Sequence, residues 1–274
     1  MSYANFKSIV WSKHIQGELP KHTVFEPECD YAFKGEVGRG KTVKILGVAR
    51  PTLGDYTGEA IGDPEIIPDS AMLMQIDQAK YFNFMVDDVD AAQGHEGLMT
   101  ALMNEATRAM AEERDSYIAK LCATGCGNDT SSAVTINSKA TAKSAVDGAL
   151  TWLWDQGVSM SRDKVSIYLD PKTYMYLNDY ILEVKNRNDR GLENGVLGRY
   201  MGADVKMTNN LYNDGSHDFL IVKTSKAVAF ASAIDEIEAY RPQGLFSDAV
   251  KGLNTFGGKV VRPKELYAIS ATVS

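Results

Sequence analysis

The string GEVGRGKT, from Gly35 to Thr42, matches the phosphate-binding pattern G-x-x-x-x-G-K-[ST] at every fixed position. In enzymes that hydrolyse nucleotides, the glycines let backbone N–H groups surround the phosphates, the lysine contacts the outer phosphates and the hydroxyl binds Mg²⁺. Those roles would fall here to Lys41 and Thr42. Asp170, at the end of the apolar run VSIYLD, could supply a second magnesium ligand.

The residues around these motifs do not supply the elements that a phosphate site requires. A phosphate-binding loop lies between a buried strand and the N-terminus of a helix. The segment after Thr42, VKILGVARP, alternates like a strand, and Gly47 and Pro51 would interrupt a helix. Pro171 directly follows Asp170, so Asp170 is expected to cap the helix that Pro171 begins. We therefore interpret GEVGRGKT as a glycine-rich turn that leads into a strand.

Other residues that could do chemistry lack the spacing of a catalytic or metal site. The four histidines are scattered and form no H-x-x-x-H pair. Cys122 and Cys126 form a C-x-x-x-C pair, without the second pair that a zinc site needs. DDVDAAQGHE is similar to a calcium loop, but Ala92 and Gln93 stand where a ligand and the turn glycine are required. We expect no catalytic residue, no metal ion and no cofactor.

The composition is that of a globular protein with one large domain or two smaller ones. The chain has 274 residues, of which 44% are hydrophobic and 24% are charged. Its net charge of −7 argues against strong, sequence-independent binding to DNA. The apolar runs are too short to cross a bilayer, and the N-terminus lacks the apolar core of a signal peptide. Three cysteines fit a reducing, cytoplasmic setting.

Two N-terminal segments predict association with other chains. Residues 1–34 show no sustained period and are interpreted as an extended arm with at most a short helix. Residues 35–87 are rich in β and turn signals, with alternation from Met72 to Ile76. This excursion has too little apolar surface to fold alone, because an isolated two-stranded hairpin is marginal in water and presents unpaired strand edges. Either it folds back on its own domain or another subunit covers it. The arm poses the same problem, and both segments indicate a protein that completes itself by association.

The clearest helix is predicted over residues 97–123, where apolar residues recur every three or four positions. Arg108, Glu112 and Asp115 are expected to lie off this apolar stripe. A second amphipathic helix is predicted to use an apolar face that ends at Trp154. The strands predicted after it include VSIYLD, ADVKMTNNL, DFLIVKT, IDEIEAYRP and a final strand pair interrupted at Pro263.

The order of these elements and several strings resemble the major capsid (coat) proteins of tailed bacteriophages. MLMQIDQAKYFNFMVDDVDAAQ is similar to the family's strand that enters the spine helix, and AEERDSYIAKL is similar to that helix. SIYLDPKTYMYL and GRYMGADVKMTNNL are similar to the strand–proline–helix unit and a later strand of the axial domain. AVAFASAIDEIEAYRP and GLNTFGGKVVRPKELYAI are similar to the closing segment. The resemblance covers nearly the whole chain.

The resemblance implies an α+β fold, the phage major-capsid fold. Its implied parts, in chain order, are an N-terminal arm (1–34), an extended β-hairpin loop (35–87), a peripheral domain (88–135 and 232–274, with the spine helix at 97–123) and an α/β axial domain (136–231). The subunit contacts that we predict on this basis are Trp11 in the arm, Lys41, Asp55 and Tyr56 in the extended loop, and Arg108 and Glu112 on the exposed side of the long helix.

The function that the resemblance implies is structural and not enzymatic. The chain would assemble with itself, as pentamers and hexamers, into the icosahedral head shell of a virion that encloses double-stranded DNA. A separate scaffolding protein and a portal are implied partners, and the DNA would be contacted weakly at most. The resemblance implies no membrane partner and assembly in the bacterial host cytoplasm. An encapsulin-like compartment is an alternative with the same fold. A nucleotide hydrolase that uses Lys41 and Thr42 is the alternative from a different class.

Overall fold

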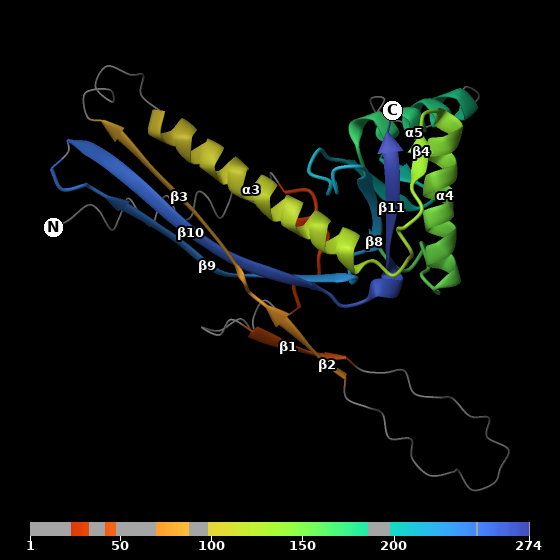
Figure 1. Cartoon of the computed structure of the whole chain (residues 1–274), viewed down its shortest axis with the longest axis horizontal. Coiled ribbons are helices and arrows are strands. Elements are labelled where there is room, and N and C mark those ends of the chain that lie inside the picture. The colour runs from red at the N-terminus through yellow and green to blue at the C-terminus, as the bar shows by residue number, and fades with distance from the viewer. Residues whose placement is uncertain are drawn as a thin grey trace, which may run out of the picture.

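The computed structural model describes six stretches of the chain: residues 23–32, 42–47, 70–87, 98–185, 198–244 and 246–273. These stretches form an α+β arrangement with two main parts, which Figure 1 shows side by side. One part is a thick unit in which two helices cover one face of a six-stranded sheet. The other is long and thin, with three strands and one long helix, and a two-stranded ribbon projects from it.

The six-stranded sheet has a core on both of its faces. In spatial order its strands are β4 (Val134–Ile136), β11 (Leu266–Val273), β8 (Asp218–Thr224), β5 (Val165–Leu169), β7 (Ala203–Met207) and β6 (Arg199–Tyr200). Strand β8 is antiparallel to both of its neighbours, β11 and β5, whereas β5 and β7 are parallel. Helices α4 (Lys139–Asp155) and α5 (Pro171–Lys185) pack on one face, and every residue of the central strand β5 is buried.

Side chains at the helix starts explain why these helices begin where they do. Ser138 accepts a hydrogen bond from the backbone N–H of Thr141, and the Thr141 hydroxyl accepts one from the backbone of Ser138, which forms a capping box. At α5, the backbone N–H of Thr173 donates to the Asp170 carboxylate at 3.2 Å, and Pro171 is the first helical residue. The prediction that Asp170 is a helix cap is confirmed.

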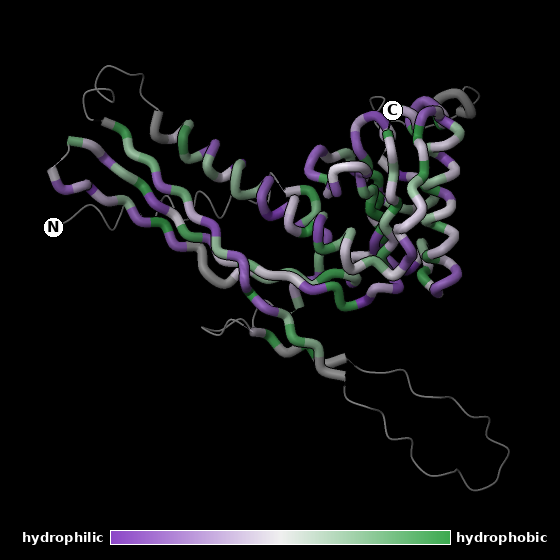
Figure 2. Tube along the Cα trace, in the orientation of Figure 1, coloured by the Kyte–Doolittle hydropathy of each residue, from purple (hydrophilic) through white to green (hydrophobic). Residues whose placement is uncertain are grey.

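The long part consists of an antiparallel sheet and the helix α3 (Leu98–Gly125), which lies along one face of it (Figure 1). In spatial order its strands are β3 (Gln78–Asp87), β10 (Ser247–Val260) and β9 (Val228–Tyr240), and we call them the long sheet. Phe82, Phe84 and Val250 of the sheet pack with Met103 of the helix. Figure 2 shows hydrophobic and hydrophilic residues interspersed along these strands, as expected for a sheet with one covered face.

The ribbon consists of β1 (Thr42–Gly47) and β2 (Ser70–Gln75), which are antiparallel. Its buried side chains, Val43, Ile45 and Met74, pack against Ala229 and Ala231 of β9. Thr42 therefore begins a strand, as predicted, and not the helix that a phosphate-binding loop would need. Residues 35–41 lie outside the described residues.

Three expectations about packing were wrong. Asp115 is fully buried, because its carboxylate is bonded to the N-terminal segment, whereas Trp154 is 47% exposed at the end of α4. The two final strands, β10 and β11, belong to different sheets, and the 3-10 helix Pro263–Glu265 separates them. Helical and strand periods predict the elements, but they do not identify the partner that covers each face.

Candidate functional site: the seam held by the N-terminal segment

Residues 23–32, here called the N-terminal segment, lie in the seam between the two parts of the molecule. The backbone N–H of Asp30 donates to the Val228 carbonyl of β9 at 2.8 Å, and the N–H of Phe230 donates to the Asp30 carbonyl at 3.2 Å. On the other side, the Phe25 ring stacks on Tyr168 of β5, with centroids 4.0 Å apart and planes 16° apart. The segment therefore contacts the long sheet and the six-stranded sheet together.

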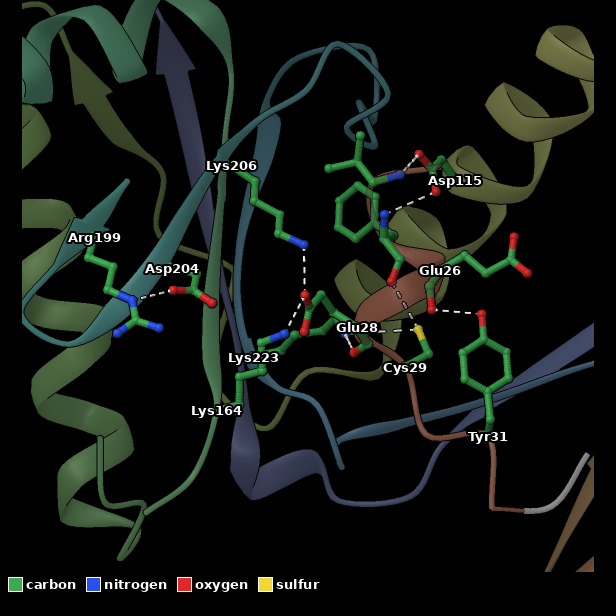
Figure 3. A network of polar contacts seen from close by, with 12 residues as sticks. Glu26, Glu28, Cys29, Tyr31, Asp115, Lys164, Arg199, Asp204, Lys206 and Lys223 are labelled. Carbon is green, nitrogen blue, oxygen red and sulfur yellow. Dashed lines mark hydrogen bonds and ion pairs between the residues drawn. The ribbon is translucent and has the colours of Figure 1, made fainter. Parts of the chain in front are cut away.

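A 3-10 turn, Glu26–Glu28, directs two carboxylates to opposite sides of the seam. Pro27 lies in its first turn, where the fixed φ of proline favours a helical start. Figure 3 shows Glu28 turned toward the lysines of the six-stranded sheet and Glu26 turned the other way. Both residues are buried, so each needs a partner of opposite charge.

On the side of the long part, Glu26 forms a buried ion pair with Arg114 of α3. The Arg114 Nη1 atom lies 3.1 Å and 3.3 Å from the two carboxylate oxygens. Arg114 also donates from Nε to the Asn254 side chain of β10 at 3.2 Å, and its guanidinium lies over the Phe256 ring. One guanidinium thus joins the N-terminal segment, the long helix and the long sheet.

On the side of the six-stranded sheet, Glu28 accepts hydrogen bonds from two lysines. Lys164 lies 2.8 Å and Lys206 lies 2.9 Å from the same Glu28 oxygen. Burial opposes ionisation of Glu28, but these two ammonium groups outweigh it and hold its pKa below the usual value of 4.5. The fully buried Lys223 of β8 donates to the Glu28 backbone carbonyl, which completes this side of the seam.

Asp115 of α3 binds the backbone at the start of the segment. Its two carboxylate oxygens accept the N–H groups of Val24 at 2.7 Å and of Phe25 at 3.1 Å. Burial raises the pKa of Asp115 from 3.8 to about 6, although these backbone bonds favour the charged form. Figure 3 shows this contact above the turn, beside α3.

The side chains of the seam serve to hold the two parts of the molecule together. Its carboxylates are bonded to cations or backbone donors, and its thiols are buried. Burial raises the pKa of Cys122 to about 12 and also raises the pKa of Cys29, so both thiols stay protonated and unreactive at neutral pH. Among the described residues, no three His, Cys, Asp or Glu side chains are grouped so as to hold a metal ion. The described helices include none that is long and apolar enough to span a membrane.

The structure brings together only two of the predicted contact residues. Arg108 and Glu112 form an exposed ion pair on α3, with Nε and Oε1 3.2 Å apart, and neither belongs to the seam. The other four predicted contacts, Trp11, Lys41, Asp55 and Tyr56, lie outside the described residues.

Sequence reasoning missed the seam, although one signal was available. Lys223 interrupts the apolar strand DFLIVKT, and a lysine inside a buried strand requires a nearby acceptor. The acceptor is the Glu28 carbonyl, 195 residues away in sequence. No local pattern joins two residues at that separation.

A second candidate surface is the face of the long sheet that α3 does not cover, here called the outer face. Strand register places Met85 beside Ala249 and Tyr81 beside Leu253, and Tyr81 is 80% and Met85 61% exposed. Around them, Lys251 pairs with Glu238 at 2.7 Å, and the Tyr240 hydroxyl donates to Asn83 at 3.1 Å. The outer face therefore offers large apolar side chains within a polar frame.

Comparisons with known proteins give the fold an identity. The sequence matched neither a protein-family model nor a curated protein. Among solved structures, one from Mycobacterium phage Che8 is 28% identical with a TM-score of 0.74, and the match covers 90% of each chain. The capsid structure of the Cyanophage P-SCSP1u is 16% identical with a TM-score of 0.71, covering 92% of this chain and 89% of that one.

A virus-like particle from Pyrococcus furiosus also matches, with 11% identity, a TM-score of 0.59, and coverage of 93% of this chain and 96% of that one. These matches confirm the α+β fold class and the family resemblance that the sequence predicted. The chain therefore has the fold of the bacteriophage capsid proteins.

Proposed function

We propose that this chain is the major capsid protein that assembles with itself, as pentamers and hexamers, into the icosahedral head shell enclosing the double-stranded DNA of a tailed bacteriophage. The observation that carries the proposal is the match to the phage Che8 structure across 90% of both chains. Because so little of either chain lies outside the match, a shared architecture for the whole subunit is the simplest explanation.

The proposal also assigns residue ranges to the parts of the subunit. Residues 1–34 would form the arm and residues 35–87 the extended loop, both reaching toward neighbouring subunits. The peripheral domain would combine 88–135 with 232–274, and the axial domain would take 136–231. In support, α3 and the long sheet form one packed part of the molecule, and the six-stranded sheet with α4 and α5 forms the other.

The proposed contacts with neighbouring subunits are of two kinds. Arg108 and Glu112 are exposed on α3, so the ion pair is open to a neighbour. Trp11, Lys41, Asp55 and Tyr56 are proposed from the family resemblance alone. A scaffolding protein and a portal are proposed partners, with assembly in the cytoplasm of the bacterial host. The net charge of −7 favours at most weak contact with packaged DNA.

Assembly of the purified chain tests this function. The chain alone, and the chain co-expressed with a candidate scaffolding protein, would be examined by sedimentation velocity and negative-stain microscopy. Rings or closed shells are the expected result, together with no Mg²⁺-dependent ATP turnover above that of a Lys41→Ala variant. A stable monomer under all conditions, combined with ATP turnover that Lys41→Ala abolishes, would overturn the proposal in favour of a nucleotide hydrolase.

A further inference from the structure

The ribbon crosses the long sheet at the point where β2 leads into β3. Strand β2 ends at Gln75 and β3 begins at Gln78, so the chain passes from the ribbon into the long sheet within a few residues. The first pair between β3 and β10 is Gln78 with Phe256. The next residue of β10, Gly257, lies against the backbone where β2 ends.

Gly257 leaves no room for a side chain at this crossing. A Cβ atom there would lie 2.2 Å from the Gln75 carbonyl oxygen and 2.7 Å from the Ile76 Cα atom. These distances are far below van der Waals contact, and the atoms belong to the backbone, which moves only if the ribbon moves. Gly257 does not have a positive φ, so space and not backbone conformation excludes a side chain.

The packing beside the crossing is equally close. Ala229 and Ala231 of β9 are fully buried under Val43, Ile45 and Met74 of the ribbon. Small side chains at these two positions let the ribbon lie near β9. The pairing of β10 with β9 also shifts register between Thr255 and Phe256, so the strand is irregular just before Gly257.

We propose that Gly257 is a positioning residue: the close approach that it permits sets the direction in which the β1–β2 ribbon leaves the subunit, and assembly requires that direction. The second half of this proposal rests on the proposed function. Under the proposed function, the residues between β1 and β2 would contact a neighbouring subunit, and any change of angle at the root of the ribbon would be amplified there. A small displacement at Gly257 therefore produces a large one where subunits would meet.

Gly252 provides a matched control on the same strand. A Cβ atom there would lie 2.3 Å from an atom of the Phe82 ring, which is a side chain and can rotate away. Gly252→Ala therefore disturbs β10 without touching the ribbon. Gly148, in α4, has no atom within 4 Å of its Cβ position, so Gly148→Ala controls for the substitution itself.

The experiment measures ribbon direction and assembly separately. Spin labels would be attached at Leu73, which is 57% exposed on β2, and at the exposed Lys120 of α3, in a Cys126→Ser background. Double electron–electron resonance spectroscopy on the isolated subunit then gives the distance between the label on the ribbon and the label on α3. Sedimentation velocity of unlabelled protein gives the concentration needed for assembly.

Gly257→Ala is expected to shift the mean label distance and to raise the assembly concentration by about tenfold or more, whereas Gly252→Ala and Gly148→Ala leave both near wild type. Should Gly257→Ala fail to fold, Ala231→Val provides a second test, because its added methyl groups push the ribbon away from β9. The proposal would be overturned if the variant that folds, Gly257→Ala or Ala231→Val, showed an unshifted label distance. It would also be overturned if that variant and Gly252→Ala had equal assembly defects. Failure of the wild-type chain to assemble counts against the proposed function alone, since the label distances still decide the role of Gly257.

Discussion

In the six-stranded sheet every residue of β5 is buried, whereas in the long sheet Tyr81 and Met85 of β3 leave 80% and 61% of their surface exposed. Helices α4 and α5 cover one face of the first sheet, and the N-terminal segment and the end of α3 cover the other. In the long sheet, α3 covers one face, and the ribbon packs against Ala229 and Ala231 of β9. Within the described residues, the first sheet thus has a core on both faces, whereas the second leaves Tyr81 and Met85 exposed on its outer face.

This difference matches the two demands that the proposed function would place on a subunit. One part must be stable before assembly, and another must keep apolar surface available to partners, since exposed apolar patches mark interaction sites. The seam joins the two parts through buried charges. Four predictions test this comparison, in order of decreasing effect on the stability of the subunit.

The largest expected loss follows removal of the Arg114 guanidinium. Arg114→Met leaves Glu26 buried without its partner, which costs about 3–5 kcal/mol when a buried ion pair is broken on one side. Urea denaturation at pH 7 would measure the loss. Arg108→Met is the matched control, since its pair with Glu112 is exposed and worth less than about 1 kcal/mol. Equal losses in the two variants would show that the seam does not tie the parts together.

Truncation in the central strand of the six-stranded sheet should also be costly. Ile167 is fully buried in β5, and Ile167→Ala is expected to lose about 2–5 kcal/mol because it leaves a cavity. Thermal and urea unfolding would measure the change. If Met85→Ala on the outer face were equally destabilising to the subunit, the contrast between the two sheets would be wrong.

The pH dependence of stability should distinguish the two sides of the seam. Because the folded-state pKa of Asp115 is raised from 3.8 to about 6, the folded protein binds a proton that the unfolded chain lacks between these pH values. Its contribution to stability is therefore fully present below pH 3.8 and is lost as the pH rises through about 6. A shift from 3.8 to about 6 corresponds to roughly 3 kcal/mol.

Unfolding free energies of wild type and Asp115→Asn, measured from pH 4 to pH 7, would test this effect. The unfolding free energy of wild type, relative to that of Asp115→Asn, should fall as the pH rises. Glu28 has the opposite sign, because its lowered pKa gives stability above pH 4.5 that is lost on acidification through its folded-state pKa. A difference for Asp115→Asn that stays constant across this range would contradict the assignment.

The smallest effect on the subunit, and the sharpest test of the outer face, is expected from Tyr81→Ser with Met85→Ser. Both side chains are exposed, so each substitution should change the stability of the isolated subunit by no more than about 0.5 kcal/mol. Sedimentation velocity should nevertheless show weaker assembly. Thr124→Ala, an exposed substitution on α3, serves as a control and should leave assembly unchanged. Normal assembly of the double variant would show that the outer face is not a contact between subunits.

Local chemistry was sufficient to predict several features of this chain. Alternation after Thr42 predicted strand β1, and Asp170 followed by Pro171 predicted the start of α5. Apolar spacing predicted a helix over 97–123, where α3 spans Leu98–Gly125. These features depend on neighbours within a turn or a strand, so consecutive residues are enough to predict them.

The sequence by itself determined the main helices and strands, their order and the exclusion of a phosphate-binding loop at Thr42. Only the tertiary structure decided which polar residues are buried. Arg114 meets Glu26 across 88 residues and Asn254 across 140, and Asp115 meets Val24 across 91. A buried charge is tolerated only when its partner is positioned in three dimensions, and periodicity along the chain carries no information about a partner so far away.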